Sequence, residues 1–508
     1  MVNNTLKFEQ YRTPSAMVAT FLVIFAVMFW ALYQWSILPF FIATPASVML
    51  MHTVVSLGLA YAQTIFLFCT ALDWKRFFAM SIIPLALGWG LIFLPWNTPD
   101  AARHLAAVYR LSNLWSGQDE WNARHDDANI IGEALNLYAG WSPSVEQYGY
   151  LLSYLYTPQQ DKTDGAQYPD KIPKMTYYSV YGYLPQVAGL TLARALGFST
   201  FAALYMARAA MLACYIAVML LALHKIPNIK NALAMTAATP IACMLAFAFS
   251  YDGMVLLAAF GWLAYGLNLR HNETKTDAIG FIIFSLLLAA AKQGAYFVVM
   301  LPLLLNWCLT KSKYRKAFLS ALGLGVACFA LINLVLPEAG RLKLAVWEDD
   351  SHLSAFYAFT NPWQFIKMGI NTWLTEGWDI IAALGGSRLA QYELAIPRSI
   401  GFAFLALSAL SAINEKPVYN LTKGEKTAMV ASIALCIILS LTMLLSFTPI
   451  DADYIQGIQG RYLLPIWPLV LLLLPKWNKY NLNKLLYVIW ATLSAISLIL
   501  ASDYFLNR

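Results

Sequence analysis

Six ionisable residues in or beside long apolar runs are the part of this sequence best suited to chemistry. Such groups are costly to place in a membrane unless they are paired or hydrated, so they mark candidate functional sites. They come from distant places along the chain: Asp100, His104, Arg208, Asp252, Lys292 and Arg461. At one membrane face they would combine a carboxylate base, an imidazole and several phosphate-binding cations.

Asp100 opens the stretch PWNTPDAARHL directly after an apolar run. A carboxylate in this place is either a general base or metal ligand just above the bilayer, or an acid stabilised by the dipole of the helix that follows. His104 lies one helical turn further on, and is either a hydrogen-bonding partner or a proton carrier. The residues alone leave both alternatives open.

The basic residues allow two interpretations as well. Lys292 in AAAKQGAY and Arg461 in QGIQGRYLLP stand at the ends of apolar runs. They either extend to lipid head groups or bind a phosphate, to which arginine offers two parallel hydrogen bonds. Arg208 lies some nine residues into its run, so it needs an anionic ligand or one of the acids as a partner.

Two acid clusters, HDDAN at 125–129 and WEDDSH at 347–352, are further candidates. Paired carboxylates can bind a divalent cation such as Mg²⁺ or Mn²⁺, but on polar loops they are more often only hydrated. No cofactor is therefore assigned, and a divalent cation stays open. The six cysteines show no CxxC spacing, and the chain has no Walker, GxSxG or HExxH motif.

The elements that must position these residues are membrane helices. Of 508 residues, 60% are hydrophobic and 12% are charged, whereas soluble proteins have about 25% charged residues. The fold class is therefore an all-α polytopic membrane protein. We predict about thirteen spans, at residues 15–38, 46–71, 77–96, 199–223, 231–250, 254–269, 277–291, 294–310, 317–337, 399–413, 427–447, 462–475 and 484–502.

Lysine and arginine between the spans predict the orientation. With a cytoplasmic N-terminus every inner loop is basic, as the positive-inside rule requires, so the net charge of +7 does not indicate nucleic-acid binding. We expect a multi-pass membrane protein whose long segments 97–198 and 338–398 face away from the cytoplasm. Amphipathic helices are expected along that surface at 98–116, capped by Thr98, and at 181–199.

This plan resembles the GT-C class of glycosyltransferases, which use polyprenyl-phosphate sugars as donors. Within that class the chain is most similar to an uncharacterised bacterial membrane-protein family, over roughly residues 77–475. The family usually has a second acid directly after the first, but this chain has Ala101 there. The alanine weakens the case for a metal site made of two adjacent acids. Four motifs carry the resemblance: an acid-x-x-x-His segment at 100–104, YLPQ at 183–186, a Ser-x-Asp turn at 250–252 and QGRYLLP at 459–465.

The resemblance implies an N-terminal helical hairpin at 1–76, a GT-C-like core at 77–475 and a C-terminal span at 476–508. It implies a location in the bacterial inner membrane, with the segments 97–198 and 338–398 on the periplasmic face. It also implies transfer of a hexose from a donor such as undecaprenyl-phosphate hexose to a surface glycan such as the O-antigen of lipopolysaccharide, with inversion. Asp100 and His104 would be catalytic. The substrate-binding residues would be Tyr183, Arg208, Asp252, Lys292, Gln459, Arg461 and Tyr462.

Two alternatives remain. An O-antigen-type polymerase or ligase also has about a dozen spans and outer arginines, but it uses a diphosphate-linked glycan. The long segment 97–198, directly after an early span, favours the transferase. A transporter of lipid-linked sugars typically has broken helices, charges near the midplane and internal repeats. This sequence has no evident repeat, and its candidate charges are expected at the outer face.

Overall fold

The computed structural model describes residues 13–36, 45–118, 145–153, 180–335, 351–389, 394–477 and 482–506. Within them the chain is almost wholly helical, with one antiparallel pair of strands, β1 (Arg388–Leu389) and β2 (Leu394–Ala395). The helices are α2 (Pro14–Ser36), α3 (Pro45–Phe68), α4 (Trp74–Ile92), α5 (Ala101–Trp115), α7 (Val145–Ser153), α8 (Leu184–Ala195), α9 (Thr200–Lys225), α10 (Lys230–Thr236), α11 (Pro240–Ala246), α12 (Asp252–Asn272), α13 (Lys275–Ala290), α14 (Ala295–Leu309), α15 (Arg315–Ala330), α16 (Tyr357–Thr360), α17 (Pro362–Leu384), α18 (Arg398–Asn414), α19 (Lys423–Leu444), α20 (Trp467–Leu473) and α21 (Asn483–Leu506). Shorter helical turns are η1 (Cys69–Ala71), η3 (Val180–Tyr183), η4 (Ala291–Gly294), η5 (Leu331–Val335), η7 (Leu445–Phe447), η8 (Gly460–Tyr462) and η9 (Leu464–Ile466).

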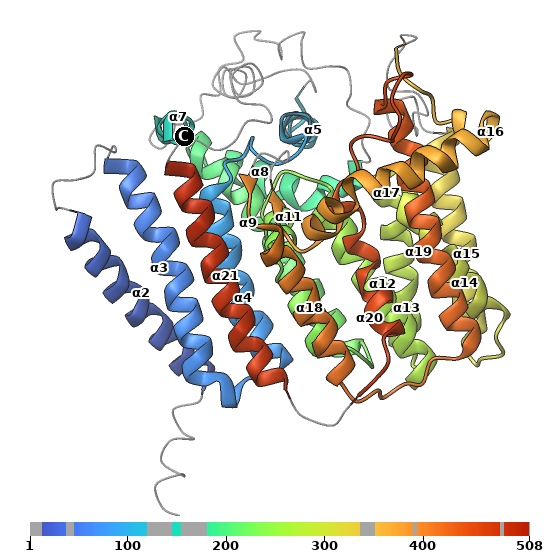
Figure 1. Cartoon of the computed structure of the whole chain (residues 1–508), viewed down its shortest axis with the longest axis horizontal. Coiled ribbons are helices and arrows are strands. Elements are labelled where there is room, and N and C mark those ends of the chain that lie inside the picture. The colour runs from blue at the N-terminus through green and yellow to red at the C-terminus, as the bar shows by residue number, and fades with distance from the viewer. Residues whose placement is uncertain are drawn as a thin grey trace, which may run out of the picture.

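The long helices stand side by side, and α5, α7, α8, α16 and α17 lie at the upper end of the bundle as drawn in Figure 1. α12 runs through the interior, where its apolar stretch is fully buried. Trp262 of α12 stacks on Trp307 of α14, with ring centroids 5.1 Å apart. α3 packs against both α2 and α21 at one side of the bundle.

By length and composition, nine segments of the described chain can cross a membrane, and Arg398–Asn414 and Gly460–Leu473 are apolar but shorter. One of the nine, Lys275–Leu309, contains both α13 and α14. The three residues 292–294 have positive φ and break the helix there. The all-α membrane fold is thus confirmed, whereas the number of thirteen spans stays a prediction.

The single span expected at 231–250 is wrong, because two short helices, α10 and α11, replace it. Thr239 caps α11 by accepting a hydrogen bond from the Ala242 N–H at 3.3 Å, and Pro240 occupies the first helical position. A break of this kind inside a membrane needs protein around its free backbone groups. All seven residues of α11 are accordingly buried.

The two surface helices expected at the upper end are present as α5 and α8, but α5 begins later than predicted. Asp100, and not Thr98, is the N-cap residue of α5. Its φ of +55° is left-handed, which reverses the chain sharply before the helix. The Thr98 hydroxyl is buried and makes no hydrogen bond within the described part of the chain, so the predicted cap is wrong.

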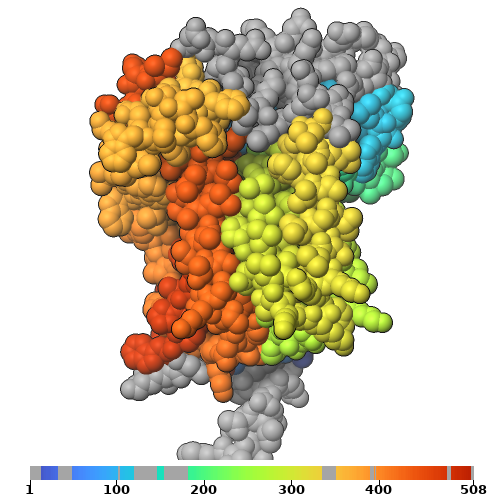
Figure 2. All heavy atoms as spheres, turned by 90° about the vertical axis from the view of Figure 1, so that its right-hand side faces the viewer, coloured from blue at the N-terminus to red at the C-terminus, as the bar shows by residue number. Residues whose placement is uncertain are grey.

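α17 lies across the upper end of the bundle and is amphipathic. Figure 2 shows α16 and α17 in amber above the long helices. Trp363, Leu374 and Trp378 of α17 are 78%, 77% and 70% exposed. A helix with such an exposed apolar row fits a position along the membrane surface.

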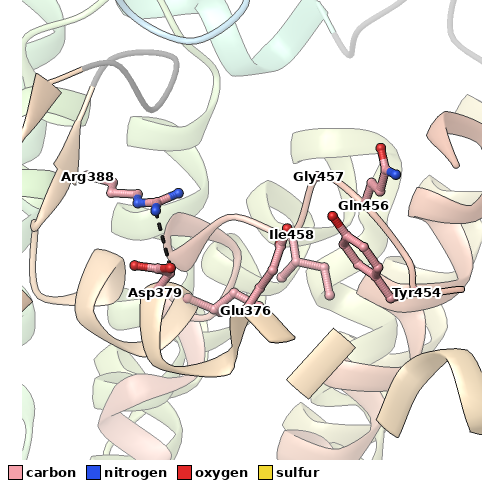
Figure 3. A pocket seen from close by; sticks show the side chains of 8 residues that line it. Glu376, Asp379, Arg388, Tyr454, Gln456, Gly457 and Ile458 are labelled. Atoms are coloured by element: carbon pink, nitrogen blue, oxygen red, sulfur yellow. Dashed lines mark ion pairs between the residues drawn. The ribbon is translucent and has the colours of Figure 1, made fainter. Parts of the chain in front are cut away.

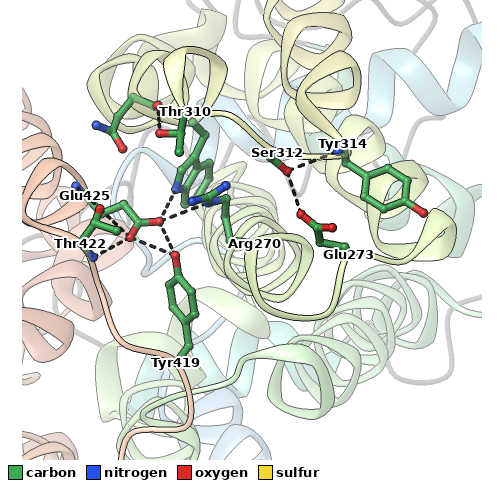
Figure 4. A network of polar contacts seen from close by, with 10 residues as sticks. Arg270, Glu273, Thr310, Ser312, Tyr314, Tyr419, Thr422 and Glu425 are labelled. Carbon is green, nitrogen blue, oxygen red and sulfur yellow. Dashed lines mark hydrogen bonds and ion pairs between the residues drawn. The ribbon is translucent and has the colours of Figure 1, made fainter.

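A buried carboxylate joins several helices at the opposite end of the bundle (Figure 4). Glu425 of α19 accepts hydrogen bonds from Trp307 Nε1 at 3.0 Å and from the Tyr419 hydroxyl at 2.8 Å. Arg270 of α12 forms an ion pair with the same carboxylate at 3.6 Å, and Thr422 completes a capping box. One side chain thereby fixes α12, α14 and α19 relative to one another.

Arg208 of α9 holds backbone segments together in the interior, where it is only 1% exposed. Its Nε donates to the Phe247 carbonyl at 2.7 Å, and its Nη1 and Nη2 donate to the carbonyls of Gly90 and Phe93 at 3.2 and 2.9 Å. These carbonyls lie at the ends of α4 and α11, where helices leave acceptors free. Backbone groups therefore replace the anionic partner expected from the sequence.

Arg208→Gln is expected to lower the free energy of unfolding by about 3 kcal/mol or more, because each buried acceptor left unpaired costs about 1–3 kcal/mol. Denaturant unfolding of the purified protein in detergent, followed by tryptophan fluorescence, measures the change. Lys275→Gln, at an exposed position, is the control and should leave stability unaltered. A loss below about 1 kcal/mol in Arg208→Gln would contradict this structural role.

Candidate functional site

The four sequence motifs meet at the upper end of the bundle. Asp100 precedes α5, Tyr183 ends η3 and Asp252 begins α12. Lys292 lies in η4 between α13 and α14, and Arg461 lies in η8 before α20. Each of these side chains stands at a helix terminus or turn, so the bundle brings together residues that are up to several hundred positions apart.

Arg461 connects the two aspartates. Its Nη2 lies 3.5 Å from Asp100 Oδ2, and its Nε lies 3.4 Å from Asp252 Oδ2. Lys292 Nζ lies 3.1 Å from the other oxygen of Asp252. The Arg461 and Asp252 side chains are 4% and 9% exposed, whereas Asp100 is 37% exposed. Two carboxylates thus balance two cations, and Asp100 is the member most open to solvent.

Three tyrosine rings surround Lys292. Its Nζ lies 4.5 Å from the ring centroid of Tyr462, 5.1 Å from that of Tyr251 and 5.9 Å from that of Tyr296. The Tyr296 hydroxyl also donates to the Tyr462 carbonyl at 2.7 Å, which fixes these two rings relative to each other. Because Lys292 is paired and enclosed, the structure does not support its extending to lipid head groups.

Hydrogen bonds also link the YLPQ motif to the Ser-x-Asp turn. Gln186 Nε2 donates to the Ser250 carbonyl at 2.9 Å, and the Asp252 N–H donates to Ser250 Oγ at 3.0 Å. Gly182 lies directly against this turn, where a Cβ would be 2.5 Å from the Cβ of Tyr251. The position of the Asp252 carboxylate therefore depends on the YLPQ segment.

His104 completes the cluster from α5. Its Nδ1 is hydrogen-bonded to the Tyr183 hydroxyl, and its ring meets the Tyr251 ring edge-on at 4.8 Å. The side chain is buried, and this burial lowers the pKa of His104 to about 4, although the charges of Asp100 and Asp252 act in the opposite direction. A neutral imidazole at neutral pH favours the hydrogen-bonding role over that of a proton carrier.

Arg461 has a hydrogen-bond donor that the described residues do not use. Its Nη1 is buried and makes no hydrogen bond within the described part of the chain, its Nε forms an ion pair with Asp252, and the Tyr462 side chain is a further partner of the guanidinium. Gly460 lets the arginine approach α17, because a Cβ there would lie 2.2 Å from the Leu384 nitrogen. A buried guanidinium with an unused N–H is well suited to bind an anionic oxygen.

A small cavity adjoins this guanidinium, and Gln459 and Arg388 of β1 are among the residues that line it. Pro99, the neighbour of Asp100, contributes to the same wall. Gln459 was predicted from the sequence, but Arg388 was missed, because no motif surrounds it within the long segment 338–398. The contribution of Tyr251 was also missed, although its position beside Asp252 could have indicated it.

A family model described as predicted membrane protein (DUF2142) matches residues 85–470. The chain belongs to this family. The match contains all four motifs, whereas α2, α3 and α21 lie outside it. A comparison with curated proteins gave no match. A comparison with solved structures gave none either.

Several candidates in this DUF2142 protein do not join the cluster. Arg208 is bonded to carbonyls elsewhere in the interior. The HDDAN segment lies outside the described residues, and only Ser351 and His352 of WEDDSH are described. Within the described residues, no three His, Cys, Asp or Glu side chains are grouped to hold a metal ion. A divalent cation therefore stays a prediction.

The buried His104 is expected to make stability depend on pH. Its folded pKa of about 4 lies below the unfolded value of 6.5, so the unfolded chain binds the proton first as the pH falls. The free energy of unfolding should therefore decrease by about 3 kcal/mol between pH 6.5 and pH 4, since one pKa unit corresponds to about 1.4 kcal/mol. Unfolding titrations compared with His104→Gln measure this, and parallel pH profiles of the two proteins would contradict it.

Proposed function

We propose that this DUF2142 protein is an integral membrane glycosyltransferase of GT-C type. It transfers a hexose from a polyprenyl-phosphate donor to a cell-surface glycan such as O-antigen. The proposal is supported by the resemblance of the four motifs and by their meeting in one site that combines a solvent-accessible carboxylate with two cations. If each motif had only a local packing role, there would be no reason for all four to meet in one place.

The unused donor of Arg461 is the observation that carries the proposal. The guanidinium lies between Asp100 and Asp252, is almost fully buried and makes no hydrogen bond through Nη1 in the described residues. A phosphate oxygen would satisfy this donor, and Lys292 would add a second positive charge nearby. The long Asp100–Arg461 separation of 3.5 Å leaves the carboxylate able to exchange its partner.

The proposed reaction is a single displacement with inversion. The acceptor hydroxyl oxygen attacks the anomeric carbon of the donor, and its proton passes to the Asp100 carboxylate. The bond between the anomeric carbon and the phosphate oxygen breaks, and the lipid phosphate leaves with the electron pair. Arg461 and Lys292 stabilise the charge of this leaving group, while His104 and Tyr183 hold the start of α5 in place.

We place the site on the periplasmic face of the bacterial inner membrane. Basic residues at the opposite ends of the helices support this, since α9 ends at Lys225, α10 begins at Lys230 and α13 begins at Lys275. Lysine in short loops favours the cytoplasmic side. No cofactor is needed for the displacement itself, and Mg²⁺ or Mn²⁺ would act, if bound, by neutralising the phosphate.

Reconstitution tests the proposal directly. The purified chain in lipid nanodiscs is incubated with radiolabelled polyprenyl-phosphate hexoses and a membrane glycan fraction, with and without Mg²⁺. We expect label to move from lipid to glycan, and protein boiled before the assay is the blank. Absence of transfer from every polyprenyl-phosphate hexose would refute the proposed donor class.

A polymerase or ligase that uses diphosphate-linked glycans is the second candidate. One observation favours it, because Arg388 and Arg461 line the same small cavity, and a second phosphate could bind there if Arg388 exchanged its partner Asp379 for it. Parallel assays with monophosphate-linked and diphosphate-linked sugars distinguish the two enzymes. Turnover with neither would shift the interpretation to a transporter of lipid-linked sugars, for which the broken segment of α10 and α11 is an expected feature.

A further inference from the structure

A second cavity, of about 260 Å³, lies near the cluster at the C-terminal half of α17 (Figure 3). Glu376 and Asp379 of α17 form one wall together with Arg388 of β1. Tyr454 and Gln456, from the segment before η8, form the other. Figure 3 shows Tyr454 across the cavity from Asp379 and Arg388. All five residues lie outside the four sequence motifs.

The cavity shares a wall residue with the small cavity beside Arg461. Arg388 lines both this cavity and the small one beside Arg461. Residues 456–458 line the larger cavity, and residues 459–461, which follow directly, line the smaller. The smaller cavity is also lined by Pro99, the neighbour of Asp100, and by Arg461, whose Nη1 has no hydrogen-bond partner in the described residues. A ligand in the larger cavity would therefore be separated from the small cavity at Arg461 by Arg388.

The walls suit a ligand rich in hydroxyl groups. Arg388 forms an ion pair with Asp379 at 3.2 Å, and Arg398 forms another with the same carboxylate. Glu376 shares a side-chain hydrogen bond with Tyr454, while burial raises the pKa of its carboxyl group. A ligand hydroxyl can replace this bond with one to either side chain. With the Arg388 charge already paired, the larger cavity is a poor site for a second phosphate. Tyr454 offers an aromatic face and a hydroxyl, a combination that suits a sugar ring.

We propose that this cavity binds the acceptor saccharide, as a neutral sugar ring at the growing end of a glycan. The inference rests on the proposed function and adds the place of its second substrate. Its volume lies just below the range of about 300–1,000 Å³ typical of drug-sized ligands, so it accommodates a terminal sugar and not a long oligosaccharide. The bound ring would present a hydroxyl past Arg388 towards Asp100.

Saturation-transfer NMR on the full chain in nanodiscs tests this without a donor lipid. The probes are methyl glycosides of glucose, galactose, mannose and rhamnose. We expect at least one to receive saturation from the wild-type protein, and Glu376→Gln and Tyr454→Phe each to weaken its affinity about tenfold, the effect of one strong hydrogen bond. Lys367→Gln, at an exposed position on the same helix, is the control and should bind like the wild type.

Two results would overturn the acceptor site: no glycoside binding to the wild type, or unchanged binding in both folded variants. Thermal unfolding establishes that each variant is folded. The transfer assay separates this from the parent proposal. Glycoside binding that is lost in Glu376→Gln, combined with no hexose transfer by the wild type from any polyprenyl-phosphate donor, would support a saccharide site here while refuting the glycosyltransferase.

Discussion

Replacing Asp100 with asparagine is expected to slow hexose transfer by about 10²–10⁴-fold, the usual contribution of a general base. The amide has the same shape but cannot accept the proton of the acceptor hydroxyl. Asparagine also tolerates the left-handed backbone at this position, where φ is +55°. Because Asp100 is 37% exposed and only 3.5 Å from its ion-pair partner, folding should change little.

The measurement is the initial rate of transfer from radiolabelled polyprenyl-phosphate hexose, with thermal unfolding recorded on the same preparations. Asp451→Asn is the matched control, since Asp451 is an exposed acid in the segment before η8. It should retain the wild-type rate. If Asp100→Asn were fully active, the base would have to be another group, and Asp252 would be the remaining carboxylate of the cluster. That carboxylate already pairs with Lys292 and Arg461, so it is the poorer base.

The sequence is sufficient to predict that distant motifs share one end of the bundle. Alternating apolar runs and basic loops determine on which side each turn lies, and this pattern alone groups Asp100, Asp252, Lys292 and Arg461. The ion pairs among them could not be predicted. They depend on how α12, η4 and η8 approach one another, which apolar periodicity does not encode.

Arg208 shows why a charge in an apolar run is an incomplete indicator of function. Its buried charge needs hydrogen-bonding or ionic partners, and from the sequence an anionic partner was expected. The structure supplies the carbonyls of Gly90, Phe93 and Phe247 instead. Helix ends leave such acceptors free, but a helix end becomes visible only when the chain is folded. The break between α10 and α11 could not be predicted for the same reason. The segment is apolar throughout, so its composition gives no sign that one helix ends before Pro240.

The cavity at α17 was beyond sequence reasoning for a different reason. Its walls come from the amphipathic helix α17, from β1 and from the loop before η8, where single acids and tyrosines normally face water and carry no signal. They become a site because Gly460 allows η8 to pack against the end of α17, with a hypothetical Cβ only 2.2 Å from the Leu384 nitrogen. The glycine belongs to the QGRYLLP motif. The motif therefore has a packing role beside the one proposed for Arg461.

Arg461→Gln is expected to reduce kcat/KM for the polyprenyl-phosphate donor by about 10²–10³-fold, as the loss of one preorganised donor to a developing anion does elsewhere. Arg461→Lys should recover part of this loss. A lysine ammonium retains the charge but cannot reach Asp100, Asp252 and a phosphate oxygen with separate N–H groups, as the planar guanidinium can. The order wild type, lysine, glutamine in activity is the signature of a bidentate site.

Binding of the polyprenyl phosphate itself separates this role from a structural one. Affinity for the unglycosylated lipid phosphate, measured by quenching of tryptophan fluorescence in nanodiscs, should fall in the order of activity, while methyl glycoside binding at the α17 cavity should persist. Lys367→Gln serves as the exposed control. If a folded Arg461→Gln protein bound the lipid phosphate as tightly as the wild type, the unused N–H of Arg461 would not bind phosphate. The phosphate site would then have to be sought at Arg388 and Lys292. Arg388→Gln is compared in the same assays, because Arg388 and Arg461 line one cavity. A loss of affinity in this variant for diphosphate-linked donors alone would identify a second phosphate subsite.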